Sequence, residues 1–215
     1  MKQKTIFLSS VLALWLLVAA VLTDLTEGVV NAEQIVNFDK HWSLIFLSWR
    51  SNLGVNLFSV ITLLGNYQLV IPILILLFFL FFKKYQSFVW PFVFTVLSAE
   101  SITFIGKLLV HRYRPDGGVM TETDFSFPSG HATIAVALYG YLAYLIIKHL
   151  KNKTAQGAVL LGALIVILII GFSRLYLGVH FVSDVLAGYL VGLLALIAGI
   201  SLREWFILKP IKNKR

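Results

Sequence analysis

The chain of 215 residues contains no cysteine, and few of its residues are charged. Without a thiol it cannot form disulfides, build thiolate metal sites or use a cysteine nucleophile. Charged residues make up 13% of the chain, against about 25% in a soluble domain, while the mean hydropathy is +0.87. No polar stretch exceeds about 30 residues, whereas a separate soluble domain needs about 50 or more. The composition predicts an all-α integral membrane protein with a single membrane-embedded domain over residues 1–215.

The formal net charge of +8 comes largely from basic clusters at the ends of apolar runs. Four clusters fall on one side if the spans alternate, and positive-inside topology assigns that side, with both termini, to the cytoplasm. They are Lys2 with Lys4, Lys83 with Lys84, Lys148 to Lys153, and Lys209 to Arg215. We therefore expect the lipid bilayer as the partner of this charge, with no nucleic acid and no obligate protein partner.

Apolar runs predict about six transmembrane helices, each near the ~20 residues that cross hydrocarbon. The predicted spans are Ile6 to Leu22, Leu69 to Phe82 extended backwards through Gly65 to Gln68, Phe88 to Val110, Ser129 to Ile147, Gly157 to Phe172, and His180 to Leu202. The first run also has features of a signal peptide. No convincing cleavage site precedes a soluble mature domain, so we expect it to be retained as a span.

A helical stripe of apolar residues follows an acidic connection that contains Asp24, Glu27, Glu33 and Asp39. The stripe consists of Phe38, Trp42, Ile45, Phe46, Trp49 and Leu53, with Asp39, Lys40, Ser43 and Arg50 off it. Tryptophan suits the headgroup level, so we expect a short interfacial helix between the first two spans that guides lipid headgroups. An ordinary amphipathic packing helix would show the same pattern.

Basic residues on the predicted outer side break the topology preference, which suggests that they have a use. They are Lys107, His111, Arg112, Arg114 and Arg174. Lys107, His111 and Arg114 share one helical face, and we expect Pro115 to stop that helix. A snorkelling basic collar at the end of a span is the alternative.

Two further motifs lie on the same side. Pro128-Ser129-Gly130-His131 opens an apolar run, so we expect Ser129 to cap a helix whose free N–H groups and dipole suit a phosphate. His180 and Asp184 are spaced i and i+4 after Ser173 and Arg174, so the carboxylate can accept Nδ1–H and leave Nε2 free as a nucleophile. Each motif alone also fits a plain helix cap or a structural pair.

Together, the motifs bring Lys107, Arg114 and Arg174 towards the Ser129 cap. Two unit cations about 4 Å apart repel by roughly 4 kcal/mol at an effective dielectric near 20. Such a cluster needs an anion, and a phosphate group supplies the charge that Asp184 alone cannot.

Three motifs in this order resemble the signature of the type 2 phosphatidic acid phosphatase superfamily. They are Lys107-x6-Arg114-Pro115, Pro128-Ser129-Gly130-His131 and Ser173-Arg174-x5-His180-x3-Asp184, within about residues 100–190. The resemblance implies a lipid phosphatase that uses no metal and no cofactor. It implies His180 as the nucleophile that forms a phosphohistidine, Asp184 as its orienting group, and His131 as the general acid. It assigns phosphate binding to Lys107, Arg114, Ser129, Gly130 and Arg174.

Two ionisable groups within spans carry separate expectations. The helix dipole and the nearby cations oppose a proton on His131, so we expect it to be charged mainly when a phosphate dianion is bound. Glu100 lies two turns before Lys107, where an ionisable group costs roughly 2.5 to 3.5 kcal/mol. We favour structural pairing with a basic neighbour over contact with a substrate headgroup.

The charge pattern places the active site on the extracytoplasmic side. The resemblance places the substrate among membrane lipid phosphates. Phosphatidylglycerol phosphate ranks first, because the compact chain resembles bacterial phosphatidylglycerophosphate phosphatases, and undecaprenyl pyrophosphate ranks second. Other readings are a lipid phosphotransferase, a vanadium haloperoxidase, which the apolar spans oppose, and a lipid transporter or scramblase.

Overall fold

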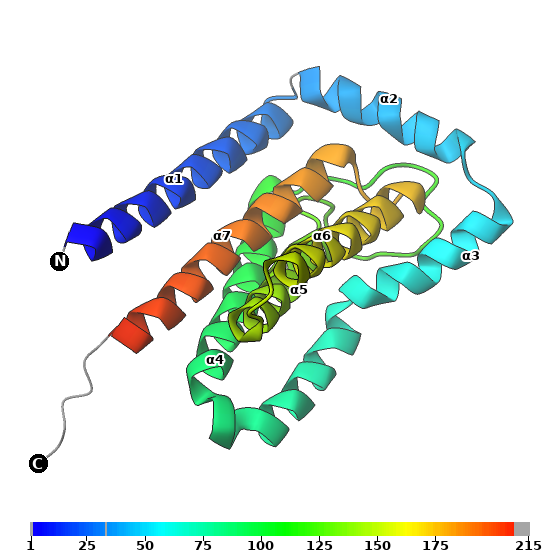
Figure 1. The fold of residues 1–215 in the computed structure, drawn as a ribbon. Helices are drawn as coiled ribbons and strands as arrows, with labels where there is room; N and C mark the ends of the chain where they lie inside the picture. Colours follow the sequence, from blue (N-terminus) through cyan, green and yellow to red (C-terminus); the bar gives the residue numbers. More distant parts are fainter. Residues whose placement is uncertain (1, 33, 209–215) are drawn as a thin grey trace, which may run out of the picture.

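The computed structural model describes residues 2–32 and 34–208, where all regular structure is helical (Figure 1). The elements in these ranges are α1 (Lys2–Val30), α2 (Gln34–Ser48), α3 (Asn52–Ile61), the 3₁₀ helix η1 (Thr62–Gly65), α4 (Tyr67–Val110), α5 (Gly130–His149), α6 (Lys153–Tyr176) and α7 (Val182–Leu208). The predicted all-α class is confirmed. Glu33 and the basic cluster Lys209 to Arg215 lie outside the described residues.

Five of the described segments are long and apolar enough to cross a membrane. They are Ser9–Val30, Ser87–Val110, Gly130–His149, Lys153–Tyr176 and Val182–Trp205. The pair formed by α2 and α3 with η1, bent by 117°, counts as a sixth if it is one broken span. The number agrees with the prediction of about six spans, but the possible sixth lies in the stretch predicted to be interfacial and not in the predicted second span.

The second predicted span begins and ends differently in the structure. Its extension backwards is right for Tyr67 and Gln68 but wrong for Gly65 and Asn66, because η1 ends at Gly65 and Asn66 caps the new helix by accepting the Gln68 N–H at 2.9 Å. The backbone also stays helical past Lys83 and Lys84, where we expected an end. Figure 1 shows that α4 turns back on itself, so the second and third predicted spans are two arms of one helix.

The predicted interfacial stripe crosses a break in the chain. Helix α2 ends at Ser48, and α3 begins at Asn52 because the Ser51 hydroxyl accepts the Gly54 N–H at 3.1 Å. On the stripe, Phe38 and Trp49 are exposed, whereas Phe46 is buried and its ring centroid lies 5.8 Å from that of Phe172 in α6. The aromatic stripe therefore serves partly as a packing face.

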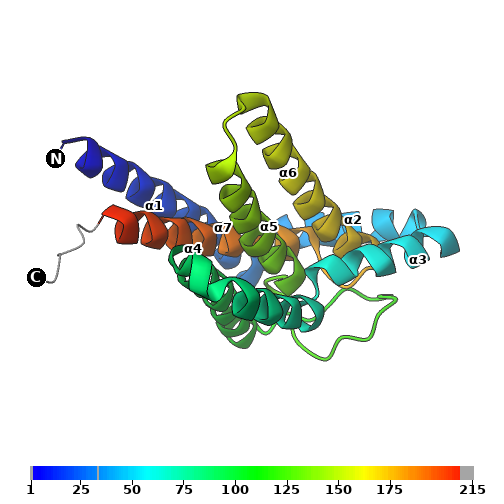
Figure 2. The ribbon, with the colours of Figure 1, turned by 60° about the horizontal axis from the view of Figure 1, so that its bottom comes forward.

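Helix α5 is the centre of the bundle and packs against α4, α6 and α7, while α1 lies along α7 (Figures 1 and 2). Figure 2 shows α5 and α6 as an antiparallel pair. Gly188 and Gly192 let α7 approach α5 closely, since a Cβ at these positions would lie 2.5 Å from the Ser129 carbonyl oxygen and 2.6 Å from that of Thr133. This contact brings the start of α7 beside the start of α5.

The outer faces of the bundle are apolar. Large side chains such as Leu17 of α1, Leu109 of α4 and Leu161 of α6 are more than half exposed, as suits contact with lipid. The motif-bearing segments all meet at one end, where α4 and α6 finish and α5 and α7 begin. The connection that contains Lys151 lies at the opposite end of α5 and α6.

Candidate active site

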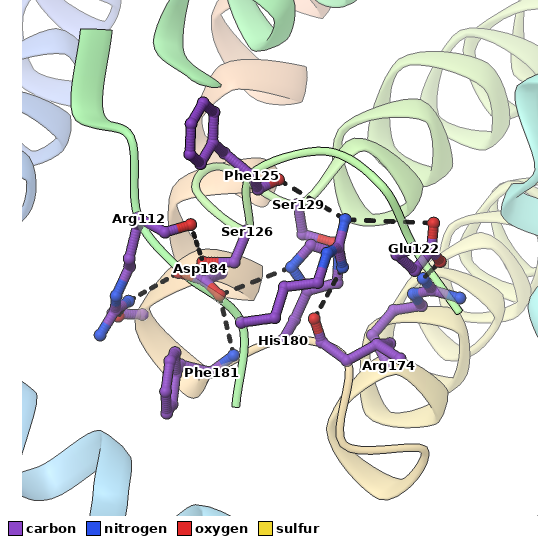
Figure 3. A network of polar contacts seen from close by, with 12 residues as sticks. Arg112, Glu122, Phe125, Ser126, Ser129, Arg174, His180, Phe181 and Asp184 are labelled. Atoms are coloured by element: carbon purple, nitrogen blue, oxygen red, sulfur yellow. Dashed lines mark hydrogen bonds and ion pairs between the residues drawn. The ribbon is translucent and has the colours of Figure 1, made fainter. Parts of the chain in front are cut away.

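His180 lies in the loop before α7, two residues ahead of the helix in which we expected it. Its Nδ1 atom is 3.5 Å from Oδ2 of Asp184, and both side chains are buried (Figure 3). The predicted full hydrogen bond from Nδ1 is therefore wrong, since this contact is too long for a good one. The reason is that Oδ2 accepts the Phe181 N–H at 2.9 Å, while Oδ1 accepts from Arg112 at 2.6 Å.

The other ring nitrogen of His180 faces a cation. Nε2 is 3.2 Å from Nη1 of Arg114, and a guanidinium can only donate hydrogen bonds. Nε2 therefore carries the lone pair, and Nδ1 carries the proton on the side of Asp184. Burial lowers the pKa of His180, and the charges of Arg174, Arg114 and Lys107 lower it further. The imidazole is held neutral, which is the form required of a nucleophile.

Lys107, Arg114 and Arg174 come together from three segments of the chain. Lys107 lies in the last turn of α4 and Arg174 in the last turn of α6, where its side chain is 1% exposed. Arg114 lies beyond the helix, because α4 ends at Val110 and not at Pro115. His111 takes a left-handed conformation there (φ 50°) and reverses the chain, so the predicted common helical face ends before His111. The predicted convergence of the three cations is confirmed, but by a different path.

Two acidic residues of the loop between α4 and α5 hold these cations, and the sequence pattern did not single them out. Asp124 accepts from Lys107 Nζ at 2.7 Å and from Arg114 Nη2 at 2.5 Å. Glu122 accepts from Arg174 Nη2, and its second oxygen is 4.0 Å from Arg114. Partial burial acts to raise the pKa of Asp124, but the hydrogen bonds and charges of Lys107 and Arg114 prevail and lower it to about 2. Asp124 is therefore ionised at neutral pH.

Ser129 is the N-cap residue of α5, as predicted, but its hydroxyl does not cap the helix. Its N–H donates to the Asp184 carbonyl oxygen at 3.0 Å, and its own carbonyl oxygen accepts from Thr133. Within the described residues, the buried Ser129 Oγ has no hydrogen-bond partner. Gly130 follows as the first residue of the helix. An unpaired buried hydroxyl at this position is available to a ligand.

His131 lies in the first turn of α5 and is half-buried. It is within electrostatic reach of His180, Arg174, Arg114 and Lys107. The close backbone of Gly65 fixes its position from the other side, since a Cβ on Gly65 would lie 3.2 Å from the His131 carbonyl oxygen. The structure thus brings the second histidine to the same cluster as His180.

A buried network supports Asp184 from behind. Arg112 donates to Asp184 at 2.6 Å and to Asp39 of α2 at 2.7 Å, and its guanidinium lies 4.3 Å from the centroid of the Phe181 ring. Asp39 has no exposed surface and also accepts the Ser183 N–H at 3.0 Å. Arg112 had one signal in the sequence, its charge on the predicted outer side. Asp39 had none beyond lying off the apolar stripe.

Glu100 has no ion pair within 4 Å among the described residues, so the predicted structural pairing is not found. Its Oε1 is buried without a hydrogen-bond partner. The reason is that Lys107, its nearest basic neighbour in sequence, donates instead to Asp124 and to the Phe125 carbonyl oxygen. The described residues also contain no group of three or more His, Asp or Glu side chains arranged to hold a metal ion.

A cavity of about 230 Å³ opens beside the cations. It is lined by Arg114, Pro115, Gly118, Met120, Thr121, Glu122, Gly178 and Val179. This volume is large enough for a phosphate group, and Arg114 is the predicted site residue among those that line it.

Comparison with known proteins gives consistent matches. The model of the PAP2 superfamily matches residues 88–207, which include all three motifs. Phosphatidylglycerophosphatase B of Bacillus subtilis is 32% identical over 177 residues, which cover 79% of this chain and 82% of that protein. An undecaprenyl-diphosphatase of Sulfolobus acidocaldarius is 29% identical over 135 residues, or 60% of each chain.

The fold has a matching solved structure. The crystal structure of a transmembrane PAP2 type phosphatidylglycerolphosphate phosphatase from Bacillus subtilis superposes with a TM-score of 0.77 at 27% identity. The match covers 96% of this chain and 98% of that one, so the likeness extends from the motif-bearing core to the peripheral helices.

Proposed function

The chain belongs to the PAP2 superfamily as a membrane lipid phosphatase, and we propose that it removes the terminal phosphate of phosphatidylglycerol phosphate through a phosphohistidine intermediate. The observation that carries the mechanism is the state of His180 Nε2. This atom has a lone pair 3.2 Å from Arg114, in a cluster that contains three cations. A neutral imidazole in such a cluster is suited to attack a phosphorus atom whose oxygens the cations neutralise.

In the first step, Nε2 of His180 attacks phosphorus and the bond from phosphorus to the lipid oxygen breaks. His131 donates a proton to the departing lipid oxygen, and Asp184 balances the positive charge that the His180 ring gains. In the second step, water attacks the phosphohistidine and gives its proton to His131. Inorganic phosphate leaves, and both histidines return to their starting states.

Lys107, Arg114 and Arg174 bind the phosphoryl oxygens, together with the Ser129 hydroxyl and the Gly130 N–H. Two features support these roles. The Ser129 hydroxyl is buried and unpaired, and the three cations lie within electrostatic reach of both histidines. Positive groups that are already in place stabilise the charge of the transition state without reorganisation.

Phosphatidylglycerol phosphate is the first-ranked substrate because the relative and the solved structure that cover most of the chain carry phosphatidylglycerophosphate activity in their names. Undecaprenyl pyrophosphate is the second candidate, favoured by the Sulfolobus relative. Both lipids end in a terminal phosphate, and the roles proposed above concern that group and not the lipid behind it.

The test is phosphate release by the purified protein in lipid micelles with a chelator present. Wild type and His180→Ala are compared on each lipid, with His149→Ala as the matched control, since His149 lies at the other end of α5. We expect release that resists the chelator and requires His180 but not His149, and the lipid turned over faster identifies the substrate. Unchanged release by His180→Ala would contradict the mechanism.

A further inference from the structure

The protein's own carboxylates engage the cations that we propose bind the phosphate. Glu122 and Asp124 accept hydrogen bonds from the terminal nitrogens of Arg174, Arg114 and Lys107, which we propose as phosphate donors. Figure 3 shows Glu122 beside Arg174. Three positive and two negative charges leave the cluster with an excess of one positive charge. Both carboxylates therefore compete with a phosphate for N–H donors of the three cations, although Arg174 Nε is buried without a hydrogen-bond partner among the described residues.

The side chains of the two acidic residues are more exposed than those of the three cations. The side chains of Glu122 and Asp124 are 25% and 54% exposed, and both belong to the irregular loop between α4 and α5. The side chains of Lys107, Arg114 and Arg174 are 12%, 15% and 1% exposed, and two of them are anchored in helices. Displacement therefore costs little packing energy but removes two charges from the cations.

We propose that Glu122 and Asp124 act as a built-in competitor that admits doubly charged phosphomonoesters and keeps singly charged phosphodiester headgroups out. This inference rests on the proposed function of the same site. A phosphomonoester dianion replaces the two carboxylates charge for charge and leaves the excess at one. A phosphodiester brings one negative charge and leaves an excess of two buried positive charges. Its binding therefore does not offset the free energy lost when the two carboxylates leave the cations.

The absolute affinity for anionic lipids matters here, because the enzyme works in a membrane that is rich in them. Anionic phosphodiesters such as phosphatidylglycerol are bulk components of a membrane, whereas a lipid phosphomonoester is a minor one. A preference expressed only as a ratio of affinities would still leave the site occupied by the abundant lipid. A competitor within the protein weakens the binding of every anion, so that the weaker ligand no longer binds at its membrane concentration.

The experiment measures phosphatase activity in mixed micelles at a fixed level of lipid phosphomonoester, while phosphatidylglycerol replaces phosphatidylcholine. Wild type is compared with Glu122→Gln, Asp124→Asn and the double variant. The control is Asp116→Asn, which removes an exposed carboxylate from the same loop and leaves the cluster intact. We expect wild type and control to tolerate phosphatidylglycerol, and the double variant to be inhibited about tenfold more strongly. Inhibition by inorganic phosphate should also increase in the double variant.

The result is informative even if a variant folds poorly. Strong inhibition of wild type by phosphatidylglycerol would overturn the proposal without any variant. Lower thermal stability of the double variant with unchanged inhibition would also overturn it, because that outcome fits a purely structural pair. His180→Ala is measured alongside. If it stays active, the proposed mechanism fails. If activity depends on His180 but phosphatidylglycerol inhibits the double variant no more than wild type, only the proposed role of Glu122 and Asp124 is contradicted.

Discussion

At the residue scale, Asp39 and Arg112 form an ion pair that supports Asp184, the carboxylate beside His180. We predict that Asp39→Asn lowers kcat about 10- to 100-fold and leaves KM within about twofold, because a small misplacement of a reacting group costs that much. Among the described residues, Asp39 has no ion pair with Lys107, Arg114 or Arg174, the proposed phosphate-binding cations, so we expect substrate binding to persist. Steady-state kinetics in lipid micelles give both constants.

The matched control for this change is Asp24→Asn, which removes an exposed carboxylate from α1. A thermal unfolding curve for each variant separates lost positioning from lost folding, since removal of one partner of a buried ion pair costs roughly 3–5 kcal/mol. A raised KM at normal kcat would show that Asp39 acts on substrate binding and would contradict the positioning role.

The chemistry-bearing residues were predictable because their spacing along the chain is short and specific. Their supporting partners were not, since Asp39 lies 73 residues from Arg112 and Glu122 lies 52 residues from Arg174. An ion pair between distant segments leaves no periodic pattern in one sequence. The charge excess of the three cations did predict that an anion was needed, and in the structure two carboxylates fill that need.

At the element scale, the approach of α7 to α5 decides whether Asp184 meets the Ser129 turn. A Cβ on Gly188 would lie 2.5 Å from the Ser129 carbonyl oxygen, so we predict that Gly188→Ala destabilises the protein by about 1–3 kcal/mol and lowers activity. Gly162→Ala is the control, because no atom lies within 4 Å of its added Cβ. Thermal unfolding in detergent and phosphate release are measured for both. Equal stability and activity of the two variants would refute the close-packing role.

Helix existence followed from apolar length, but helix ends depended on single backbone events. Asn66 starts α4 with a side-chain cap, and His111 ends it through a left-handed conformation four residues before Pro115. Proline is the visible stop signal in a sequence, whereas a non-glycine residue at positive φ is stabilised by its surroundings. The two predicted spans anticipated the reversal of the chain within α4 that Figure 1 shows, but not that the backbone stays helical through Lys83 and Lys84, since lysine is a good helix former.

At the scale of the whole molecule, the positive-inside pattern and the position of the site together support a proposed orientation of the protein in the membrane. The site lies at the end of the bundle opposite the connection between α5 and α6, which carries Lys151 in the basic cluster Lys148 to Lys153. If that connection is cytoplasmic, as its charge predicts, the site faces the outer side of the membrane and both termini face the cytoplasm. Lipid phosphates would then be hydrolysed in the outer leaflet.

The absence of cysteine makes this topology directly measurable, since each introduced thiol is the only one in the protein. Asp116→Cys places an exposed thiol in the loop beside the site, and Lys151→Cys places one in the connection between α5 and α6. We predict that a membrane-impermeant maleimide labels Asp116→Cys in intact cells and labels Lys151→Cys only after permeabilisation. Preserved phosphatase activity confirms that each variant is folded. The reverse pattern would place the site in the cytoplasm, so that the basic cluster would no longer set the orientation and the enzyme would draw its substrate from the inner leaflet.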